Sequence, residues 1–281
     1  MKPQQKNEIH VTVAKENIQS PDVKYRGIFL NDEDWGLQPW AAKNIDTEVK
    51  DLGPKTYTHI FELLLRLKAN YIWPAMHPST KAFYFYKENP KIADDYAIVV
   101  GSSHCEPMLR NNVFEWAVNY ENEYGKKPGE WRYDLNKQQI DQYWFDRVDE
   151  SKNYESVYTI GMRGIHDGSM PGPKDRNEKI KLLNEVMRIQ RRMLEDNSIK
   201  PINSIPQIFC PYKEVLTLYR AGLELADDVT IVWADDNHGY IRQLSNPQEQ
   251  KRSGGSGIYY HVSYWGAPQD YLWLSSISPS L

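Results

Sequence analysis

The chain has only two cysteines among its 281 residues, Cys105 and Cys210, and they lie far apart in the sequence. A disulfide scaffold would need more cysteines at closer spacing, so none is expected, and both residues are predicted to be buried thiols. No run of about 18 apolar residues occurs, and residues 1–17 are polar. The sequence therefore indicates neither a membrane-spanning helix nor a signal peptide.

An excess of positive charge is also missing. The formal net charge is −4, and charged residues make up 26% of the chain. Proteins that bind nucleic acid or anionic membranes usually carry basic patches, so neither partner is expected. The hydrophobic fraction of 40% is typical of a globular protein with a sizeable core. The length suits a single α/β barrel of about 250 residues.

Several common catalytic signatures are absent. No glycine-rich turn follows the first predicted strand, which argues against a doubly wound nucleotide-binding sheet. The Gly-Gly-Ser-Gly run at residues 254–257 precedes a strand and is poorly placed to cradle phosphate. His-Glu-x-x-His and Gly-x-Ser-x-Gly do not occur, nor does a His-x-His pair after the first strand. Standard zinc-peptidase and serine-hydrolase sites are therefore disfavoured.

What the sequence does contain is a repeated alternation of strands and helices. Apolar residues at helical spacing predict helices within 51–69, where Pro54 begins the helix, and at 180–194 and 216–223. Strands alternating with helices imply parallel strands joined by right-handed crossovers. Runs rich in β-forming residues predict seven strands, at 25–30, 71–78, 97–104, 158–165, 207–212, 229–234 and 257–265.

The predicted strands end in polar residues, as barrel strands do where their loops build an active site. We therefore predict an α/β fold of the (β/α)8 TIM-barrel class, incomplete here with about seven β/α units. The barrel is expected over residues 24–281, with its last strand beyond Leu281. Residues 1–23 are interpreted as a polar lead-in from a preceding domain or linker. A doubly wound sheet is the alternative fold.

Carboxylates at the strand ends favour hydrolysis of a glycosidic bond. That reaction needs a proton donor and a second carboxylate that activates water or attacks. Asp167 and Glu214 follow consecutive strands. Arg163 and Lys213 flank them, as a clamp for a substrate carboxylate or as internal ion-pair partners. If the barrel closes, further acids lie nearby, namely Asp32, Asp34, Asp235 and Asp236.

Two other functions compete with this one. Histidines at or near strand ends, together with aspartates, are suitable ligands for zinc or manganese, which would give a metal-dependent TIM-barrel hydrolase. The 19 tyrosines and 9 tryptophans also suit a non-catalytic carbohydrate-binding fragment. Such a fragment would not need acids at several strand ends, so the enzyme is favoured. The histidines are His77, His104, His166, His238 and His261.

Several motifs together resemble family 115 of the glycoside hydrolases, the xylan α-1,2-glucuronidases. The resemblance runs from about Tyr25 to the end of the chain. The motifs are YRGIFLNDED at 25–34, IWPAMH at 72–77, SSHCEPM at 102–108, IGMRGIHDG at 160–168, PYKEV at 211–215, WADDN at 233–237 and YHVSYWG at 260–266.

The resemblance implies an inverting hydrolase that removes glucuronic acid, often 4-O-methylated, from xylose units of glucuronoxylan without a metal cofactor. It implies a barrel preceded by an α/β domain and followed by helical and β-rich domains, commonly assembled as a dimer, and a periplasmic or secreted protein. By motif matching, Glu214 and Asp167 take the acid and base roles, in an order left open, and a buried acid near Tyr212 or Trp233 should have a raised pKa. The implied sugar-site residues are Asp32 or Asp34, Trp73, His104, Arg163, His166, Asn237 and Tyr264.

Overall fold

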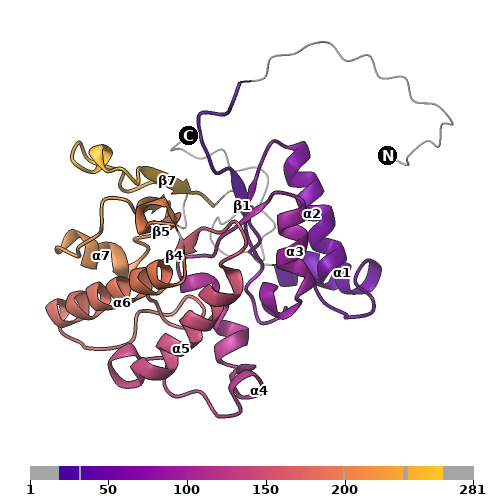
Figure 1. Ribbon diagram of the computed structural model, residues 1–281, viewed down its shortest axis with the longest axis horizontal. Helices are drawn as coiled ribbons and strands as arrows, with labels where there is room; N and C mark the ends of the chain where they lie inside the picture. The colour runs from indigo at the N-terminus through magenta and orange to yellow at the C-terminus, as the bar shows by residue number, and fades with distance from the viewer. Residues whose placement is uncertain (1–18, 32, 199, 237–239, 262–281) are drawn as a thin grey trace.

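The computed structural model describes residues 19–31, 33–198, 200–236 and 240–261 (Figure 1). Seven short strands lie within this part of the chain, one in each predicted strand region, although most are shorter than predicted. Their bounds are β1 Gly27–Phe29, β2 Tyr71–Trp73, β3 Val99–Val100, β4 Tyr158–Thr159, β5 Gln207–Phe209, β6 Thr230–Ala234 and β7 Ser256–Tyr259.

All strand pairs are parallel, and their order follows the sequence. One sheet has the order β1-β2-β3 and the other β4-β5-β6-β7. A parallel bridge between Val100 and Ser156 joins the two, and the Val157 N–H donates to the Val100 carbonyl at 2.9 Å. The predicted parallel α/β architecture is confirmed, and the described strands show none of the order reversal that defines a doubly wound sheet.

The two ends of this strand series contact each other through aromatic rings. The Phe29 ring in β1 lies 5.8 Å from the Tyr259 ring in β7, and the Trp73 ring in β2 lies 5.2 Å from it. Consecutive parallel strands whose first and last members meet in this way form a curved surface with an inner and an outer face. The rings of Phe29, Trp73 and Tyr259 lie on the inner face.

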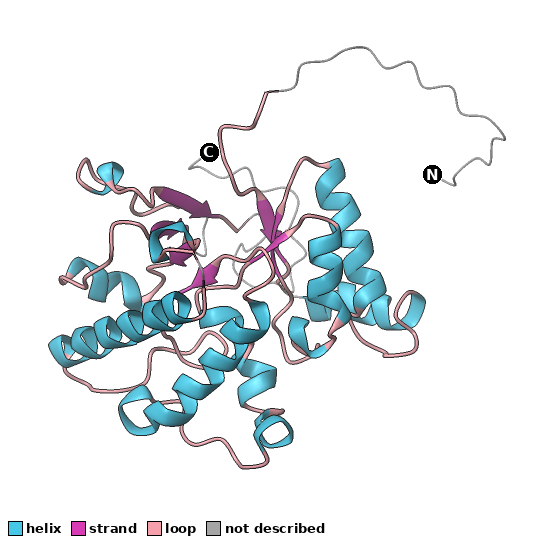
Figure 2. Ribbon diagram, viewed as in Figure 1, coloured by secondary structure: helices cyan, strands magenta, loops and turns pink. Residues whose placement is uncertain are grey.

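Helices lie outside the strands, with α1 to α3 beside the first sheet and α5 to α7 beside the second (Figure 2). The predicted helices at 51–69, 180–194 and 216–223 are confirmed as α2, α6 and α7, whereas α1 and α3 were not predicted. Both are short and contain a proline, which hides the helical periodicity. The helices are α1 Leu37–Asn44, α2 Pro54–Arg66, α3 Glu88–Asp95, α4 Tyr120–Tyr124, α5 Tyr133–Ser151, α6 Arg176–Asp196 and α7 Glu214–Arg220.

Both faces of β3, β4 and β5 are buried, as their nearly continuous apolar sequences predict. The same prediction is wrong for β1 and β7, which are partly exposed, with Ile28 43% and Ile258 51% exposed. In the β5 region, Phe209 packs against the helices, while Ile208, Cys210 and Tyr212 belong to an inner cluster with Trp73. Cys105 and Cys210 are buried free thiols, as predicted, and burial raises the pKa of Cys210 to about 12. The alternation carries Tyr212 to the inner face just where β5 has ended.

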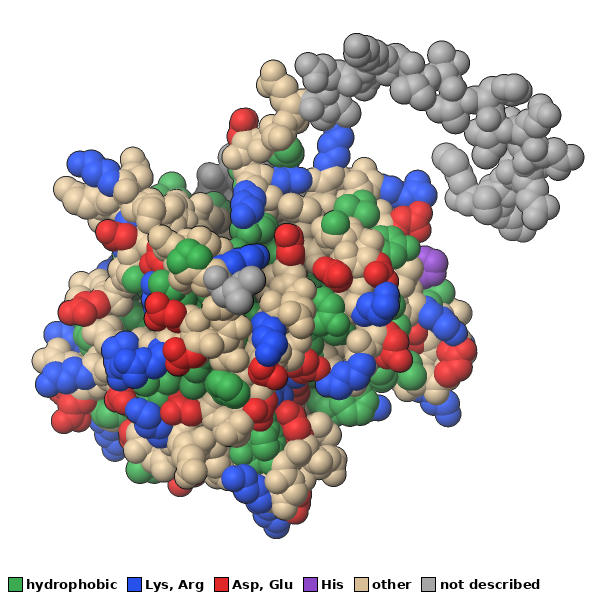
Figure 3. All heavy atoms as spheres, viewed as in Figure 1, with side chains coloured by type: hydrophobic (Ala, Val, Ile, Leu, Met, Phe, Trp, Pro, Cys, Tyr) green, Lys and Arg blue, Asp and Glu red, His purple; other side chains and the backbone are tan. Residues whose placement is uncertain are grey.

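Charged side chains of both signs lie on the described part of the surface that Figure 3 shows. Figure 3 shows acidic and basic side chains interspersed over the face in view, in keeping with the small net charge. Among the described helices, none is both long and apolar enough to cross a membrane.

The side chain of Gln190 on α6 bonds to the backbone of Gly161, just after β4, where a neighbouring strand would otherwise pair. Its side chain accepts from the Gly161 N–H at 2.7 Å and donates to the Gly161 carbonyl at 2.8 Å, fully buried. Gln190→Leu should lower the free energy of unfolding by about 2–5 kcal/mol, because two buried backbone groups lose their partners. Urea denaturation measures this, with the exposed Gln142→Leu as control. A loss below about 1 kcal/mol would contradict it.

Candidate active site

Arg163 lies at the centre of the polar side chains that follow the strands. It comes shortly after β4, its side chain is 2% exposed, and its backbone carbonyl accepts from the Trp131 indole N–H at 2.8 Å. The guanidinium reaches two carboxylates that belong to different strand ends, those of Asp167 and Glu214. The sequence placed these three residues together, and the structure brings them into direct contact.

Asp167 is held by donors from three elements. Its Oδ1 accepts from Arg163 Nη1 at 2.5 Å and lies 3.2 Å from His104 Nε2, which follows β3. Its Oδ2 pairs with the ammonium of Lys213, which follows β5. The carboxylate therefore ties together the ends of three neighbouring strands.

Glu214 is the first residue of α7, and its carboxylate accepts hydrogen bonds from the Arg163 guanidinium. Arg163 Nε donates to Oε1 at 3.1 Å and Nη2 donates to Oε2 at 2.7 Å. The Met170 backbone N–H also donates to Oε1, at 2.9 Å. A fork of this kind fixes the carboxylate in position and orientation.

The backbone is strained directly before each acid. His166 has φ 58° and Lys213 has φ 48°, in the left-handed region that non-glycine residues seldom occupy. Such conformations cost about 1–3 kcal/mol each and persist where the surroundings hold them. Here each one turns the following carboxylate towards Arg163.

The pKa values of both acids lie below their ordinary range. Burial alone would raise the pKa of Asp167, but hydrogen bonds from His104, Lys213 and Arg163 outweigh it. Burial would likewise raise the pKa of Glu214, and Arg163 with the Met170 N–H reverses the effect. The raised pKa predicted for one of the pair is thus wrong for the substrate-free protein, because the shared cation stabilises both charges.

These lowered pKa values predict how acid affects stability. An acid whose pKa is lower in the folded state adds stability above its unfolded pKa, about 3.9 for Asp, and loses it as the pH falls towards the folded value. Asp167→Asn should therefore destabilise the protein at pH 7 and progressively less below pH 4. Urea unfolding across that range measures the difference, with the exposed Asp196→Asn as control. A penalty independent of pH would contradict the prediction.

His104 is a buried neutral partner in this cluster. Its ring lies 4.3 Å from the Tyr212 ring, and burial lowers its pKa more than Asp167 raises it. Its Nδ1 is buried and has no hydrogen-bond partner among the described residues. A neutral imidazole with its proton on Nε2 donates to Asp167 and leaves Nδ1 as an acceptor.

The comparisons with known proteins identify the family. The model of glycosyl hydrolase family 115 matches residues 18–281. The chain belongs to glycosyl hydrolase family 115. Thirteen chains of solved structures match this family 115 chain, and one is described as a family GH115 4-O-methyl-α-glucuronidase, BtGH115A, with specificity for decorated arabinogalactans. It is 50% identical with a TM-score of 0.86, and the match covers 93% of this chain and 34% of that one.

The chain thus spans about a third of the length of that solved relative. No curated protein matched it. The resemblance to family 115 predicted from the seven motifs is confirmed by these matches.

Other predicted site residues of this family 115 chain lie outside the cluster formed by Arg163, Asp167 and Glu214. Trp73 is 6% exposed, packs within the inner cluster and donates its indole N–H to the Tyr71 hydroxyl at 2.7 Å. Asp34 pairs with His77, at 3.1 Å from Nδ1, and the exposed His166 has its ring 5.2 Å from that of His77. Asp32, Asn237, His238 and Tyr264 lie outside the described residues.

The end of β6 carries a histidine–aspartate pair rather than an isolated acid. Asp235 is buried and its Oδ1 lies 2.5 Å from His261 Nδ1, while the His261 N–H also donates to the carboxylate. The His261 ring is 4.5 Å from the Tyr259 ring. Asp236 accepts from Arg242 Nε at 2.7 Å. His261 was considered only as a metal ligand, and the spacing of 26 residues hid its partner.

Sequence reasoning assigned no role to Glu33 or Glu106, two buried acids. Glu106 follows β3 and accepts from the Ser103 hydroxyl at 3.2 Å. Burial raises its pKa well above the ordinary value, which overrides the Ser103 bond. Burial also raises the pKa of Glu33, after β1. Both residues belong to sequence motifs that follow a strand, and this position was the one sequence feature that could have marked them as candidate site residues.

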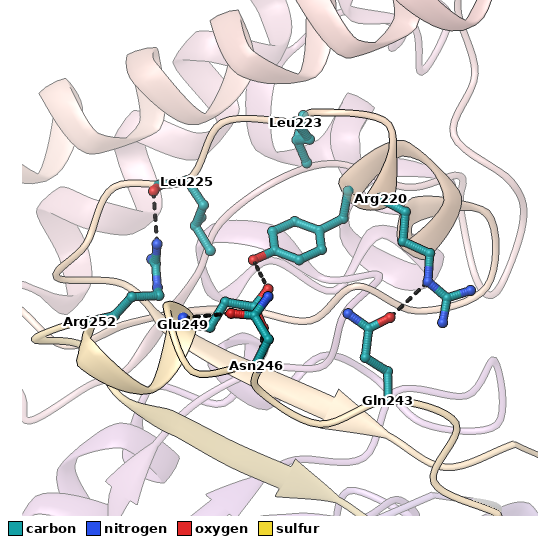
Figure 4. Close-up of a pocket in the computed structure, with 8 residues that line it drawn as sticks. Arg220, Leu223, Leu225, Gln243, Asn246, Glu249 and Arg252 are labelled. Atoms are coloured by element: carbon teal, nitrogen blue, oxygen red, sulfur yellow. Dashed lines mark hydrogen bonds between the residues drawn. The ribbon is translucent and has the colours of Figure 1, made fainter.

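Two cavities among the described residues lie away from Arg163. One, of about 410 Å³, lies between α7 and the connection from β6 to β7 (Figure 4). Within it, the Tyr219 hydroxyl donates to Glu249 at 2.7 Å and Arg220 Nε donates to Gln243 at 2.7 Å. The other, of about 790 Å³, lies beside α6. Neither is lined by Asp167 or Glu214, so these hollows belong to the outer surface.

Proposed function

We propose that this chain carries the catalytic site of an α-glucuronidase that removes glucuronic acid or its 4-O-methyl ether, α-1,2-linked to xylose in glucuronoxylan. One observation carries the proposal: a buried guanidinium, Arg163, shared by two carboxylates at the ends of parallel strands. A uronic acid brings a carboxylate that a guanidinium recognises, and its glycosidic bond needs two acids for hydrolysis. The 4-O-methyl-α-glucuronidase activity of the solved relative supports this assignment.

The proposed reaction inverts the anomeric carbon. One carboxyl group donates its proton to the glycosidic oxygen as the C1–O bond breaks, and the other takes a proton from the water that attacks C1 from the opposite face. Asp167 contacts two cations and His104, whereas Glu214 contacts one cation and a neutral backbone N–H, which favours Asp167 as base and Glu214 as acid. A substrate carboxylate drawing on Arg163 would weaken the hold on Glu214, raise its pKa and supply the acid.

We further propose that the strands form most of a (β/α) barrel. The sequential strand order, the Val100–Ser156 bridge and the contact of Phe29 with Tyr259 support this. In such a barrel the ends of β1 to β7 surround one site. A substrate that is a plant polysaccharide is met outside the cytoplasm, so we propose a periplasmic or secreted location, with the other domains and the dimer implied by the family resemblance.

The test is an assay of the full chain on glucuronoxylan oligosaccharides, with decorated arabinogalactan in parallel. Release of β-glucuronate as the first anomer, seen by NMR, is expected, and Asp167→Asn and Glu214→Gln should each lower kcat by about 10²-fold or more. The exposed Asp196→Asn and Glu121→Gln serve as controls. An α anomer would refute inversion, and activity on arabinogalactan alone would refute the xylan assignment.

A carbohydrate-binding module would behave differently in the same variants. Calorimetry with a glucuronoxylan fragment then separates the two functions. An enzyme should still bind the fragment in Glu214→Gln while turnover falls, because the amide keeps the shape of the carboxylate. The module would be favoured if the unmodified chain bound the fragment without any turnover and the variants lost that binding.

A further inference from the structure

A second cluster of ligating side chains lies outside the Arg163 site. The loop after β1 supplies Glu33 and Asp34, and the segment after β2 supplies His77. One carboxylate oxygen of each acid and one ring nitrogen of His77 lie within 4.8 Å of one another. These residues come from two neighbouring strand ends, 44 positions apart in the sequence.

Glu33 gives independent evidence for a ligand. Its side chain is buried, at 2% exposure, and its Oε1 accepts from the His77 N–H at 2.6 Å and from the Thr80 hydroxyl at 3.1 Å. Its Oε2 is buried and has no hydrogen-bond partner among the described residues. A buried carboxylate oxygen left without a partner is costly, and a bound cation removes that cost.

The geometry of His77 fits an ion held on its Nδ1. Nδ1 lies 3.1 Å from Asp34 Oδ1, a separation suited to two atoms that each coordinate one ion at about 2.0–2.2 Å. On the other side of the ring, Nε2 lies 2.9 Å from the Asn31 amide oxygen. Histidine ligands usually donate their second ring N–H to an oxygen of this kind, and this bond sets the orientation of the ring.

We propose that Glu33, Asp34 and His77 bind a divalent transition-metal ion, with Zn²⁺ or Mn²⁺ as the matching ions because the donor set mixes imidazole with carboxylates. This assigns Asp34 to the ion instead of to the sugar. The ion joins the end of β1 to that of β2. Through the contact of the His77 and His166 rings at 5.2 Å, it also supports the loop that carries Asp167. The proposal stands independently of the glucuronidase assignment.

The test is calorimetric titration of the chelator-treated full chain with Zn²⁺, Mn²⁺ and Ca²⁺ separately. We expect one Zn²⁺ or Mn²⁺ per chain and a raised Tm with that ion present. Asp34→Asn, at a side chain that is 40% exposed and tolerant of change, and His77→Gln should each weaken binding by about tenfold or more. The exposed Asp95→Asn and His59→Gln are the matched controls.

Three results would overturn the site. They are no binding of Zn²⁺ or Mn²⁺ by the unmodified chain, binding of Ca²⁺ alone, and unchanged affinity in Asp34→Asn and His77→Gln. Far-UV circular dichroism of both variants checks that they are folded. Because metal binding is measured without substrate, failure here is distinguishable from failure of the proposed hydrolase.

Discussion

Replacing Arg163 by methionine is expected to lower kcat/KM on a glucuronate-bearing oligosaccharide by about 10⁴-fold. The guanidinium is proposed both to bind the substrate carboxylate and to hold the two reacting carboxyl groups, and losses in binding and orientation combine in the transition state. Steady-state kinetics measure the change. Arg163→Lys should recover part of the activity, because an ammonium keeps the charge but not the fork.

The same variant should also show an altered pH profile. Without the guanidinium, Asp167 keeps only His104 and Lys213 against its burial, and Glu214 keeps only the Met170 N–H, so both pKa values should rise. The acidic limb of the rate profile then moves to higher pH. Arg176→Met, at an exposed position on α6, is the control. A loss of activity with an unmoved profile would show that Arg163 does not control these two acids.

Glu115→Gln is expected to lower the free energy of unfolding by about 3–5 kcal/mol, the typical cost of breaking a buried ion pair. Glu115 lies between two buried arginines: Arg110 Nη1 is 3.0 Å from its Oε1, and Arg147 pairs with the same oxygen. The amide keeps the size of the side chain but leaves two guanidinium groups in the interior with too little negative charge.

Urea denaturation at pH 7 measures the effect, and Glu121→Gln, exposed on α4, should change stability by less than about 0.5 kcal/mol. The Arg110 and Arg147 side chains also stack on Tyr143 and Tyr84, at 4.1 and 4.0 Å. These stacking contacts survive the substitution, so the measured loss reports the charge. Arg110 Nη2 also donates to Glu123 Oε1 at 2.9 Å. A loss no larger than the control would mean that the rings and Glu123 are enough to stabilise the two guanidinium groups.

The meeting of Arg163, Asp167 and Glu214 was predictable because of a general property of parallel sheets. Residues that follow successive strands emerge at the same edge, so strand positions alone place side chains together. The seven strands were predictable from short runs of β-forming residues, although β3 and β4 have only two paired residues each. Past β4, the backbone of Gly161 bonds to the Gln190 side chain instead of to a neighbouring strand.

What was missed depends on contacts between distant residues. Three acids occur in a row after β1, and nothing local indicates that Glu33 is buried while Asp34 is exposed, since Thr80 and His77 decide it. Trp73 has the composition of a sugar platform, yet its place in the inner cluster follows from Phe29 and Tyr259. The direction of the pKa shifts of Asp167 and Glu214 could not be predicted from the sequence, because it depends on how many donors surround each carboxylate in the folded protein.

The loop from Arg163 to Met170 closes on itself. The Gly164 N–H donates to the Gly168 carbonyl at 3.0 Å, and the Gly168 N–H donates to the Ile165 carbonyl at 3.2 Å. A Cβ at Gly164 would lie 2.7 Å from the Ser169 carbonyl oxygen. One inserted or deleted residue would separate Arg163 from Asp167 or Met170 from Glu214. Loop grafts between family members must therefore transfer 163–170 intact together with Lys213 and Glu214, and new substrate preferences are better sought in other loops.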